Sequence, residues 1–544
     1  MAGGRSRVAR AKENRCPFDQ APDWTADRPD PARWCGTLKN VNASSGVFAP
    51  THRALSVGIL LSITAIACEG MAVATIMPSA ALDLGGLDSY GWAFSAFMLA
   101  SLVGAINAGQ AADRGDVCMP ARVGFAAFSV GLVVAGLAPS WPVLLLARAL
   151  QGFGAGCLSA IAYVAVARGY PKRLRPRLLA LLSSAWIMPA LLGPALAGQV
   201  AEHVSWRLVF IGILPPMAIG AWMLLPSLAR LPEASGSSTD TRRVVASVRL
   251  ATGAALMLLA LGLPGLFAVV LVGALGLVLA VPALRVLLPA GTFSGRTGLP
   301  AAVAVRGLLA FGFFGSEALL PLGLSTQRSL PPSLVGLSLT AGALAWVLGS
   351  WVQDRAEARS AGALPDRAVR VAAGLLLIGL GIGGVAAGIL TPNLPVALVV
   401  VAWGIGGLGM GLAYPASTLT ALGMAPGGQE GLAAASLQVA ETAGIATGTG
   451  AAGALLALAP HLNRMMSDGL SWGFLLAAVA ILAALAPTAR LAPPSRGPGG
   501  PSQAPSPCPS SGALIKPKRS LVHVCRISAT RVCGQYAAKA SICP

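Results

Sequence analysis

The sequence predicts an all-α polytopic membrane protein with about fourteen transmembrane helices, because of its composition and its apolar runs. Hydrophobic residues make up 55% of the 544 residues and charged residues only 11%, whereas about a quarter of a soluble chain is charged. So few charged side chains cannot coat a water-exposed surface of this size, but they suffice in lipid. The 66 glycines agree with this class, because small residues let helices approach closely in a bilayer.

Apolar runs long enough to cross a bilayer, about 20 residues each, recur along the chain. The first six runs lie at 55–77, 90–110, 121–138, 142–167, 178–200 and 207–228. Two closely spaced runs, which could instead form one re-entrant hairpin, lie at 249–266 and 268–288. Six more runs lie at 300–323, 333–352, 370–390, 395–415, 431–457 and 470–488.

The runs and the polar segments between them divide the chain into domains. The predicted domains are a disordered cytoplasmic tail at 1–50, a six-helix bundle at 51–229, a cytoplasmic linker at 230–248, two extra transmembrane helices within 249–289, a second six-helix bundle at 290–491 and a disordered cytoplasmic tail at 492–544. Both tails mix prolines, glycines and charges without an apolar period, a composition that cannot bury enough surface to fold.

Loop charge predicts the orientation. If both termini are cytoplasmic, the external loops contain only Arg207, Arg328 and Arg464. The basic residues of the cytoplasmic loops are then Arg114, Arg122, Arg168, Lys172, Arg173, Arg175, Arg177, Arg230, Arg242, Arg243, Arg249, Arg285, Arg296, Arg306, Arg355, Arg359, Arg367 and Arg370. This asymmetry follows the positive-inside rule and predicts a multi-pass protein of the cell membrane with an even number of spans. It also argues against nucleic-acid binding, which the net charge of +19 alone would suggest.

Several chemical functions have no support in the sequence. The nine cysteines contain no C-x-x-C spacing, so neither a zinc site nor a redox motif is predicted. The four histidines, His52, His203, His461 and His523, are predicted in loops or tails, and no catalytic constellation forms around them. No G-x-x-x-x-G-K-[ST] loop is present, which argues against ATP-driven transport. We therefore expect no enzyme activity and no cofactor.

The loop between the second and third runs carries a motif suited to gating. Gly109 is followed by the acid–arginine pair Asp113 and Arg114 at a tight cytoplasmic turn. A carboxylate there can accept bonds from a helix N-terminus or an arginine, and glycine permits a close turn. This 109–116 loop is predicted to hold one group of helices against the next.

The fourth run contains an arginine inside the membrane. Arg148 is expensive in lipid, so it is expected to face the interior of the bundle or a wet cavity. Gln151 and Gly152 follow on the same helix, and the glycines at 152, 154 and 156 offer a smooth surface to a neighbouring helix. Arg148 is assigned to proton transfer or packing rather than to substrate contact.

The fifth run contains a helix-bending pair. Gly193 and Pro194 lie in mid-membrane, with Gly198 one turn further along. Proline removes a backbone hydrogen bond, and the resulting bend is tolerated where neighbouring helices restore the bonding. These residues are predicted to take part in conformational change.

Together these motifs resemble the major facilitator superfamily, and specifically its fourteen-span drug:proton antiporter branch. The resemblance covers about residues 55 to 490 and is densest from Thr75 to Pro215. In the family's order, it runs through Ile76-Met-Pro78, Tyr90-Gly-Trp92, the 109–116 loop, the arginine–glutamine–glycine helix, the Gly193-Pro194 motif and Ser205-Trp206-Arg207 with Phe210. The resemblance implies two six-helix bundles plus two extra central helices.

The second half matches the family less closely. Asp354 and Arg355 lie where a second copy of the gating loop would fall. The first loop also departs from the family pattern, because Gly115 follows the arginine directly and Asp116 takes a place where positive charge is usual. Ala197 replaces one of the usual paired glycines in the antiporter motif.

Three carboxyl groups lie inside apolar runs: Glu69 in the first, Glu317 in the ninth and Glu441 in the thirteenth. Burial in a low dielectric disfavours the charged form of a carboxyl, which favours proton exchange. A cationic substrate could also displace the proton from such a site. Each glutamate is therefore a candidate for proton coupling or for the substrate cavity, together with Arg148; the alternative for each is a hydrogen-bonded structural role.

The resemblance and the buried acids lead to one leading expectation. The chain is expected to be a monomeric secondary transporter that exports small amphiphilic compounds in exchange for protons, by rocking of its two halves about a midplane cavity. The proton gradient would supply the energy, and the partners would be the lipid bilayer, protons and a small-molecule substrate. The alternatives are the same fold with a narrow physiological substrate, such as a metabolite, lipid or amino acid, and a transport-dead membrane sensor.

Overall fold

The computed structural model describes residues 46–171, 173–231, 240–261, 263, 266–359, 364–424, 430–462 and 464–491. These residues belong to a compact unit that extends from Met1 to Pro493. The tail predicted at 492–544, nearly all of the tail at 1–50 and most of the polar part of the predicted linker lie outside the described residues. In the described part of the chain the regular structure is entirely helical.

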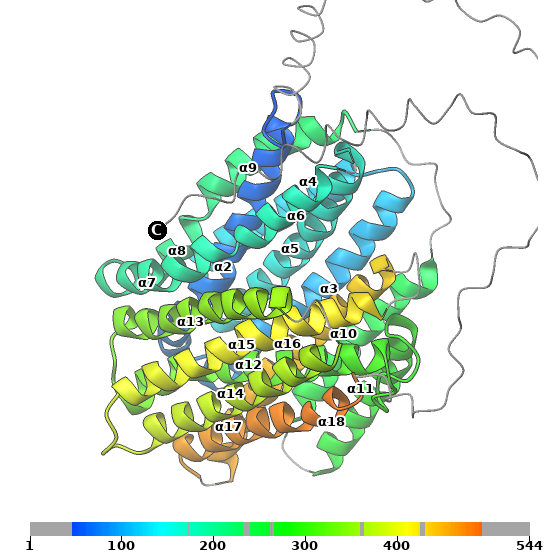
Figure 1. Cartoon of the computed structure of the whole chain (residues 1–544). Helices are drawn as coiled ribbons and strands as arrows, with labels where there is room; N and C mark the ends of the chain where they lie inside the picture. Colours follow the sequence, from blue (N-terminus) through cyan, green and yellow to red (C-terminus); the bar gives the residue numbers. More distant parts are fainter. Residues whose placement is uncertain are drawn as a thin grey trace, which may run out of the picture. The chain divides into compact units, whose positions relative to one another are not determined.

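The elements follow the apolar runs in order (Figure 1). The first half contains α2 (Arg53–Leu84), η1 (Leu87–Ser89), α3 (Trp92–Asp113), α4 (Cys118–Gly136), α5 (Trp141–Gly169), α6 (Arg175–Ser184), α7 (Ile187–His203), α8 (Trp206–Ile211) and α9 (Leu214–Leu228). The central pair is α10 (Thr241–Leu261) and α11 (Leu266–Leu287). The second half contains α12 (Leu299–Gln327), α13 (Pro332–Arg359), α14 (Leu364–Leu390), α15 (Ala397–Gly423), α16 (Glu430–His461), α17 (Met466–Ala483) and α18 (Leu485–Thr488).

Within the described residues, 13 helical segments are long and apolar enough to cross a membrane. The predicted fifth run, 178–200, is not among them, because it is divided into α6 and α7. The interruption falls at Ala185 and Trp186. Pro189 explains it, since this residue has no N–H to donate to the carbonyl of Ala185 four residues earlier. A bend is predicted at Gly193-Pro194, and α7 continues through that pair without interruption.

Successive spans run in opposite directions, so the bundle has two ends. We call the end that contains η1 the η1 end, and the end where α9 stops and α10 starts the linker end. At the η1 end, Asp83 of α2 accepts hydrogen bonds from Arg207 (2.8 Å) and from the Trp206 indole (3.2 Å). These bonds show what the Ser205-Trp206-Arg207 motif does, because they tie the start of α8 to the end of α2.

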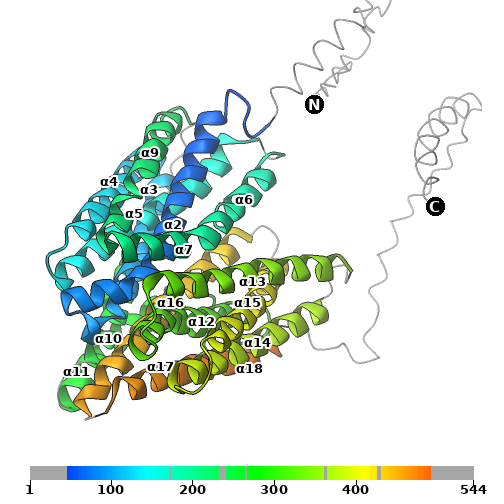
Figure 2. The same cartoon turned by 90° about the vertical axis from the view of Figure 1, so that its left-hand side faces the viewer.

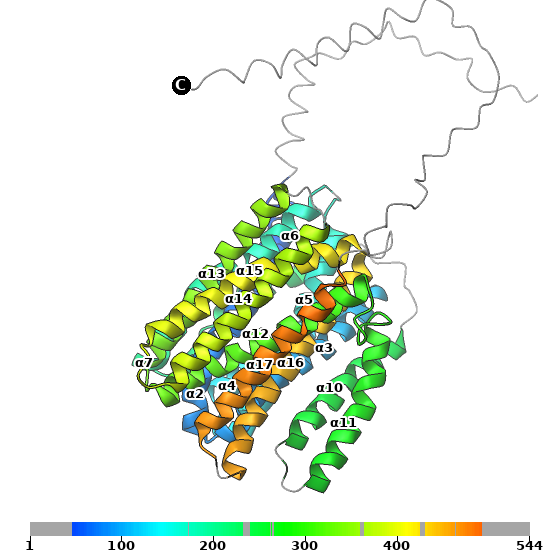
Figure 3. The same ribbon diagram turned by 60° about the horizontal axis from the view of Figure 1, so that its bottom comes forward.

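The central pair consists of two full-length helices packed against each other. Gly253 of α10 lies against the backbone of Gly276 and Ala280 of α11, where an added side chain would collide. Leu99 of α3, Ala254 of α10 and Ala446 of α16 pack in one apolar cluster. Figure 3 shows α10 and α11 at the edge of the bundle, with α10 beside α3 and α16. The alternative of a single re-entrant hairpin does not fit two helices that are each long enough to span.

The first and second halves meet in two places at the η1 end. Gly91 at the start of α3 lies against Gly453 of α16, with backbone approaching backbone. Gly198 of α7 packs in the same way on Pro332 and Ser333 at the start of α13, and Figure 2 shows these two helices side by side. Both contacts depend on glycine, because any side chain would hold the helices apart.

Inside the first half, α3 and α5 are packed through glycines over their central turns. Gly104 of α3 lies against Phe153 of α5, while Gly152 and Gly156 of α5 lie against the carbonyls of Phe97 and Ser101. Two glycines of the predicted surface on the fourth run thus contact the second run, whereas Gly154 lies against Gly124 and Phe128 of α4.

We expect Gly152→Val to destabilise the protein, because the new side chain would collide with the Phe97 backbone. Overpacking of this kind costs about 1–3 kcal/mol. Gly109→Val is the matched control on α3, since a side chain there meets open space. Thermal unfolding in detergent measures both variants, and equal melting temperatures would contradict the close α3–α5 contact.

Candidate functional site

The first candidate site is a buried ion pair between Glu69 of α2 and Arg148 of α5. Glu69 is 0% exposed and Arg148 is 2% exposed, and Arg148 Nη1 donates to Glu69 Oε1. Arg148 also donates to Gln151 Oε1 (2.6 Å) and, from Nε, to the carbonyl of Ala93 in α3 (3.0 Å). Its guanidinium lies 4.4 Å from the centre of the Phe97 ring. One arginine therefore joins α2, α3 and α5.

The hydrogen bonding of this cluster is incomplete on the carboxylate. Glu69 Oε2 is buried and has no hydrogen-bond partner among the described residues, and the same holds for Gln151 Nε2. A proton can add at Glu69 Oε2 without breaking a bond that the structure contains. Protonation would remove the charge that balances Arg148, so the arrangement can couple proton binding to the contacts of Arg148.

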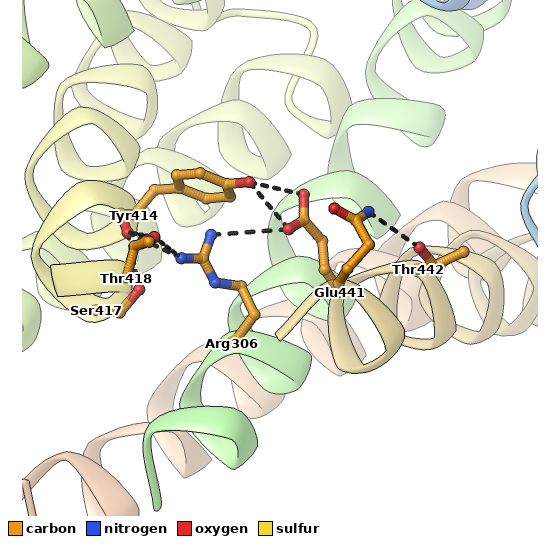
Figure 4. A network of polar contacts seen from close by, with 7 residues as sticks. Arg306, Tyr414, Ser417, Thr418, Glu441 and Thr442 are labelled. Carbon is orange, nitrogen blue, oxygen red and sulfur yellow. Dashed lines mark hydrogen bonds and ion pairs between the residues drawn. The ribbon is translucent and has the colours of Figure 1, made fainter. Parts of the chain in front are cut away.

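The second candidate site lies in the other half and joins α12, α15 and α16 (Figure 4). The Tyr414 hydroxyl lies 3.0 and 2.9 Å from the two oxygens of Glu441, and Arg306 Nη1 lies 3.8 Å from Glu441 Oε2. Arg306 Nη2 donates to the Tyr414 carbonyl (3.0 Å) and to Thr418 Oγ1. The guanidinium is 3.6 Å from the centre of the Tyr414 ring.

The prediction that Arg306 belongs to a cytoplasmic loop is wrong. Arg306 lies inside α12 and is 1% exposed. Its Nε and Nη1 atoms have no hydrogen-bond partner among the described residues, although Nη1 forms the long ion pair with Glu441. The signal was present in the sequence, because Arg306 falls within an apolar run as Arg148 does. Counting it as a loop charge hid the second cluster.

The two clusters are built from the same parts. Each contains a buried arginine, a glutamate and an aromatic ring beneath the guanidinium, and each joins three helices of one half. They differ in enclosure, since the side chain of Glu69 is 0% exposed and that of Glu441 is 15% exposed. Tyr163 of α5 interacts electrostatically with Glu441, so a residue of the first half faces the second cluster.

Glu317, the third predicted acid, is placed differently. It lies in α12 and is partly exposed. Within the described chain it has no hydrogen bond or ion pair, so neither arginine neutralises it. An unpaired carboxyl in a spanning helix is suited to hold a proton or the cationic group of a ligand.

The 109–116 loop has a different construction from the one expected. Asp113 and Arg114 are exposed, and the tight turn is made by Gly115 at φ 108°, whereas Gly109 lies within α3 with open space beside it. Asp116 accepts the backbone N–H groups of Cys118 and Met119, both at 3.0 Å, and so caps α4. This capping explains an acidic residue where the family usually has a basic one.

An arginine outside the motif holds this loop. Arg168 at the end of α5 donates from Nη2 to the carbonyl of Ala112 (2.6 Å). Sequence reasoning counted Arg168 only as a loop charge. Its partner is a backbone carbonyl, so no residue type in the sequence points to it.

The second copy of the loop is also displaced from the expected residues. Asp354 and Arg355 at the end of α13 are exposed and form no hydrogen bond or ion pair through their side chains with a described residue. Glu357, on the next turn, forms ion pairs with Arg367 and Arg370 (2.6 Å for Arg370) and thereby ties α13 to α14. We had not singled out Glu357.

The antiporter motif lies between the halves. Gly193 faces Met71 of α2 at an ordinary contact distance, and the carbonyl of Pro194 lies against Gly336 of α13. Gly198 contacts the start of α13, so α7 touches both halves over its length. Among the described residues no three His, Cys, Asp or Glu side chains are grouped so that they could hold a metal ion.

A bundle of spanning helices in two halves, with buried charges inside each half, defines a polytopic membrane transporter. Residues 59–364 match the family model described as Major Facilitator Superfamily, and the chain therefore belongs to this superfamily of secondary transporters. This membership places it among multi-pass membrane transporters of small molecules and not among enzymes.

Curated relatives share parts of the chain. It is 27% identical over 302 residues to the acurin A biosynthesis cluster MFS-type transporter of Aspergillus aculeatus, covering 54% of this chain and 50% of that protein. It is 27% identical over 168 residues to multidrug resistance protein 3 of Bacillus subtilis, covering 31% of this chain and 33% of that protein. The chain spans half or less of the length of these relatives.

Solved structures agree with the fold. A POT family transporter in complex with 5-aminolevulinic acid superposes with a TM-score of 0.61 at 15% identity, covering 83% of this chain and 99% of that one. The human organic anion transporter MFSD10 (TETRAN) gives a TM-score of 0.53 at 15% identity, covering 81% and 100%. At this identity the likeness concerns the fold alone.

We expect Glu69→Gln and Arg148→Gln each to destabilise the protein by about 3–5 kcal/mol, because each leaves a buried group without its charged partner. The double variant should lose less than the two single losses combined, since it leaves no lone charge. Thermal unfolding in detergent of the wild type, the two single variants and the double variant gives the double-mutant cycle. Strictly additive losses would mean that the two side chains do not stabilise each other.

Proposed function

We propose that this transporter exports small amphiphilic compounds or drugs across the cell membrane in exchange for protons, by alternating access. The observation that carries the proposal is Glu69, a carboxyl wholly enclosed within the spans. It is paired to one arginine, and its second oxygen has no partner in the described part of the chain. Relatives named as multidrug efflux proteins support the substrate class, and so does the resemblance to the fourteen-span drug:proton antiporters.

In the proposed cycle, proton binding at Glu69 weakens its pairing with Arg148. Arg148 also bonds the carbonyl of Ala93, two residues before Ser95, whose hydroxyl donates to the carbonyl of Ala446 in α16 (2.7 Å). On α3, the residue that Arg148 bonds therefore lies two positions from a residue that contacts the second half. This proximity supports a coupling of protonation to the separation of α3 from α16.

The loop charges support an orientation with the linker end in the cytoplasm. If the linker end is cytoplasmic, the contacts of α3 with α16 and of α7 with α13 close the external side. We propose that they separate in the outward-open state, while the 109–116 loop of the first half approaches the end of α13, where Glu357 lies, in the second half. Gly193, Pro194 and Gly198 then act at the contact between α7 and α13.

Glu317 and Glu441 complete the proposed cavity. Glu317 has no partner in the described structure, so it can exchange a proton for a cationic group by charge competition. Glu441 is tied to Tyr414 and Arg306, which gives the second half a charge-balanced pair like that of the first.

A narrow physiological substrate is the second candidate. It is favoured by the likeness to a fungal transporter named for a biosynthesis cluster. A transport-dead sensor would also keep the fold. Flux measurements separate the three possibilities, because a sensor moves nothing and a narrow carrier moves only one chemical class.

The central test uses the purified protein in liposomes with an imposed pH gradient. Movement of a fluorescent lipophilic cation and the internal pH are followed together. Gradient-driven movement is expected, and Glu69→Gln should abolish it because this carboxamide cannot carry the proton. Asp88→Asn is the control, since it removes an exposed carboxyl at η1. Movement indifferent to the gradient would reject proton coupling, and full activity of Glu69→Gln would remove Glu69 from that role.

The proposed role of Glu317 can be tested by comparing the transport of a cationic and an uncharged substrate. Glu317→Gln is expected to raise KM for a lipophilic cation roughly tenfold, the loss of about 1.4 kcal/mol of binding. KM for an uncharged amphiphile should stay unchanged, because no ionic contact is lost. Equal effects on both compounds would indicate a packing role for Glu317.

A further inference from the structure

A groove opens on the outside of the central helix pair at the linker end, between the start of α10 and the end of α11. Its volume is about 410 Å³. The residues that line it are Thr241, Arg242, Val245, Ala246, Arg249, Pro282, Ala283 and Val286. Two buried alanines, Ala246 and Ala283, form its floor, while Val245 and Val286 are exposed beside it. The groove is therefore apolar along its length and charged on one side.

The charged side consists of Arg242 and Arg249. They are seven residues apart on α10, so they lie on the same face, about 10 Å apart along the axis. Both are exposed, and neither guanidinium has a hydrogen bond or ion pair with a described residue. The other described charged residues at these ends of α10 and α11 are Arg243, Arg285 and Asp240, whose carboxylate accepts the Arg242 backbone N–H (3.2 Å). Positive charge predominates.

Arg249 was expected in a loop, but it lies inside α10, within the segment that is able to span the membrane. Eight residues of helix place it about 12 Å from the helix start. A guanidinium within a membrane-spanning segment is costly in lipid unless it meets an anion or reaches the interface. Neither guanidinium has an anionic partner among the described residues, and the outer face of α11 is apolar, with Val278 at 68% and Phe267 at 81% exposure.

We propose that this groove binds an anionic glycerophospholipid. The phosphate lies between Arg242 and Arg249, and one acyl chain follows the groove between Val245 and Val286 over the alanine floor. A phosphate with attached acyl chains matches both sides of the groove, and basic pockets between spanning helices are suited to such headgroups. The bound lipid supports α10, which packs on α3 and α16. This inference does not depend on what the protein transports.

Binding can be measured on the full-length protein in detergent by native mass spectrometry, with phosphatidylglycerol and phosphatidylcholine as probes. Wild-type protein is expected to bind phosphatidylglycerol in preference to phosphatidylcholine. The double variant Arg242→Gln/Arg249→Gln should bind phosphatidylglycerol about thirtyfold more weakly, since each basic residue contributes a factor of about five to six. Val286→Trp keeps both arginines but fills the groove from an exposed position, and it should also weaken binding.

The matched control is Arg173→Gln/Arg177→Gln, which removes two exposed arginines at the linker end on and next to α6. It should bind phosphatidylglycerol as wild type does. The proposal is overturned by wild-type binding in the Arg242/Arg249 variant, or by an equal loss in the control. It is also overturned by unchanged binding in Val286→Trp, which would mean that surface charge acts without the groove. Equal binding of the two lipids by the wild type would exclude charge recognition.

Discussion

The hydrocarbon core of a bilayer contains no water to accept or donate hydrogen bonds, so polar groups inside the spans depend on partners from the protein. The arginines at 148 and 306 show how strongly this constraint shapes the molecule. Each is almost wholly buried, and each binds a carboxylate and a backbone carbonyl from other helices of its half. The charges thus act as fixed points around which three helices are arranged.

The same solvent explains the glycines. Lipid gives helices no hydrophobic reason to associate, so association depends on close packing. Glycines hold α3 against α5 within the first half, and glycines also meet across the halves at Gly91, Gly198 and Gly453. The two sets differ in extent, because the glycine contact of α3 with α5 covers several turns, whereas the glycine contacts between the halves at Gly91, Gly198 and Gly453 lie at the η1 end. Rocking of the halves requires only the second set to separate.

Much of the fold was predictable from the sequence, since a run of apolar residues specifies a span without reference to the rest of the chain. The hydrogen-bond partners of the buried and loop arginines could not be predicted, because they belong to helices that are distant in the sequence. Arg306 bonds the carbonyl of Tyr414, 108 residues away, and Arg168 bonds the carbonyl of Ala112, 56 residues away. A backbone carbonyl has no signature in a sequence. The interruption before Pro189 was missed for a related reason, since Gly193-Pro194 is the more conspicuous signal but α7 continues through it.

The two arginine–glutamate pairs contain the same kinds of residues, but their glutamates differ in exposure. This difference bears on the order of events in the proposed exchange. In the first half, Arg148 donates directly to Glu69, and the pair is sealed. In the second half, Tyr414 holds both oxygens of Glu441 while Arg306 stays at 3.8 Å, and the carboxyl is partly exposed. A proton therefore reaches Glu441 with less rearrangement than Glu69 requires. Because Arg148 is linked through Ala93 and α3 to the contact with α16, we propose that opening of this enclosed pair accompanies movement of the halves. Proton uptake at Glu69 and separation of the η1 end would then be a single event.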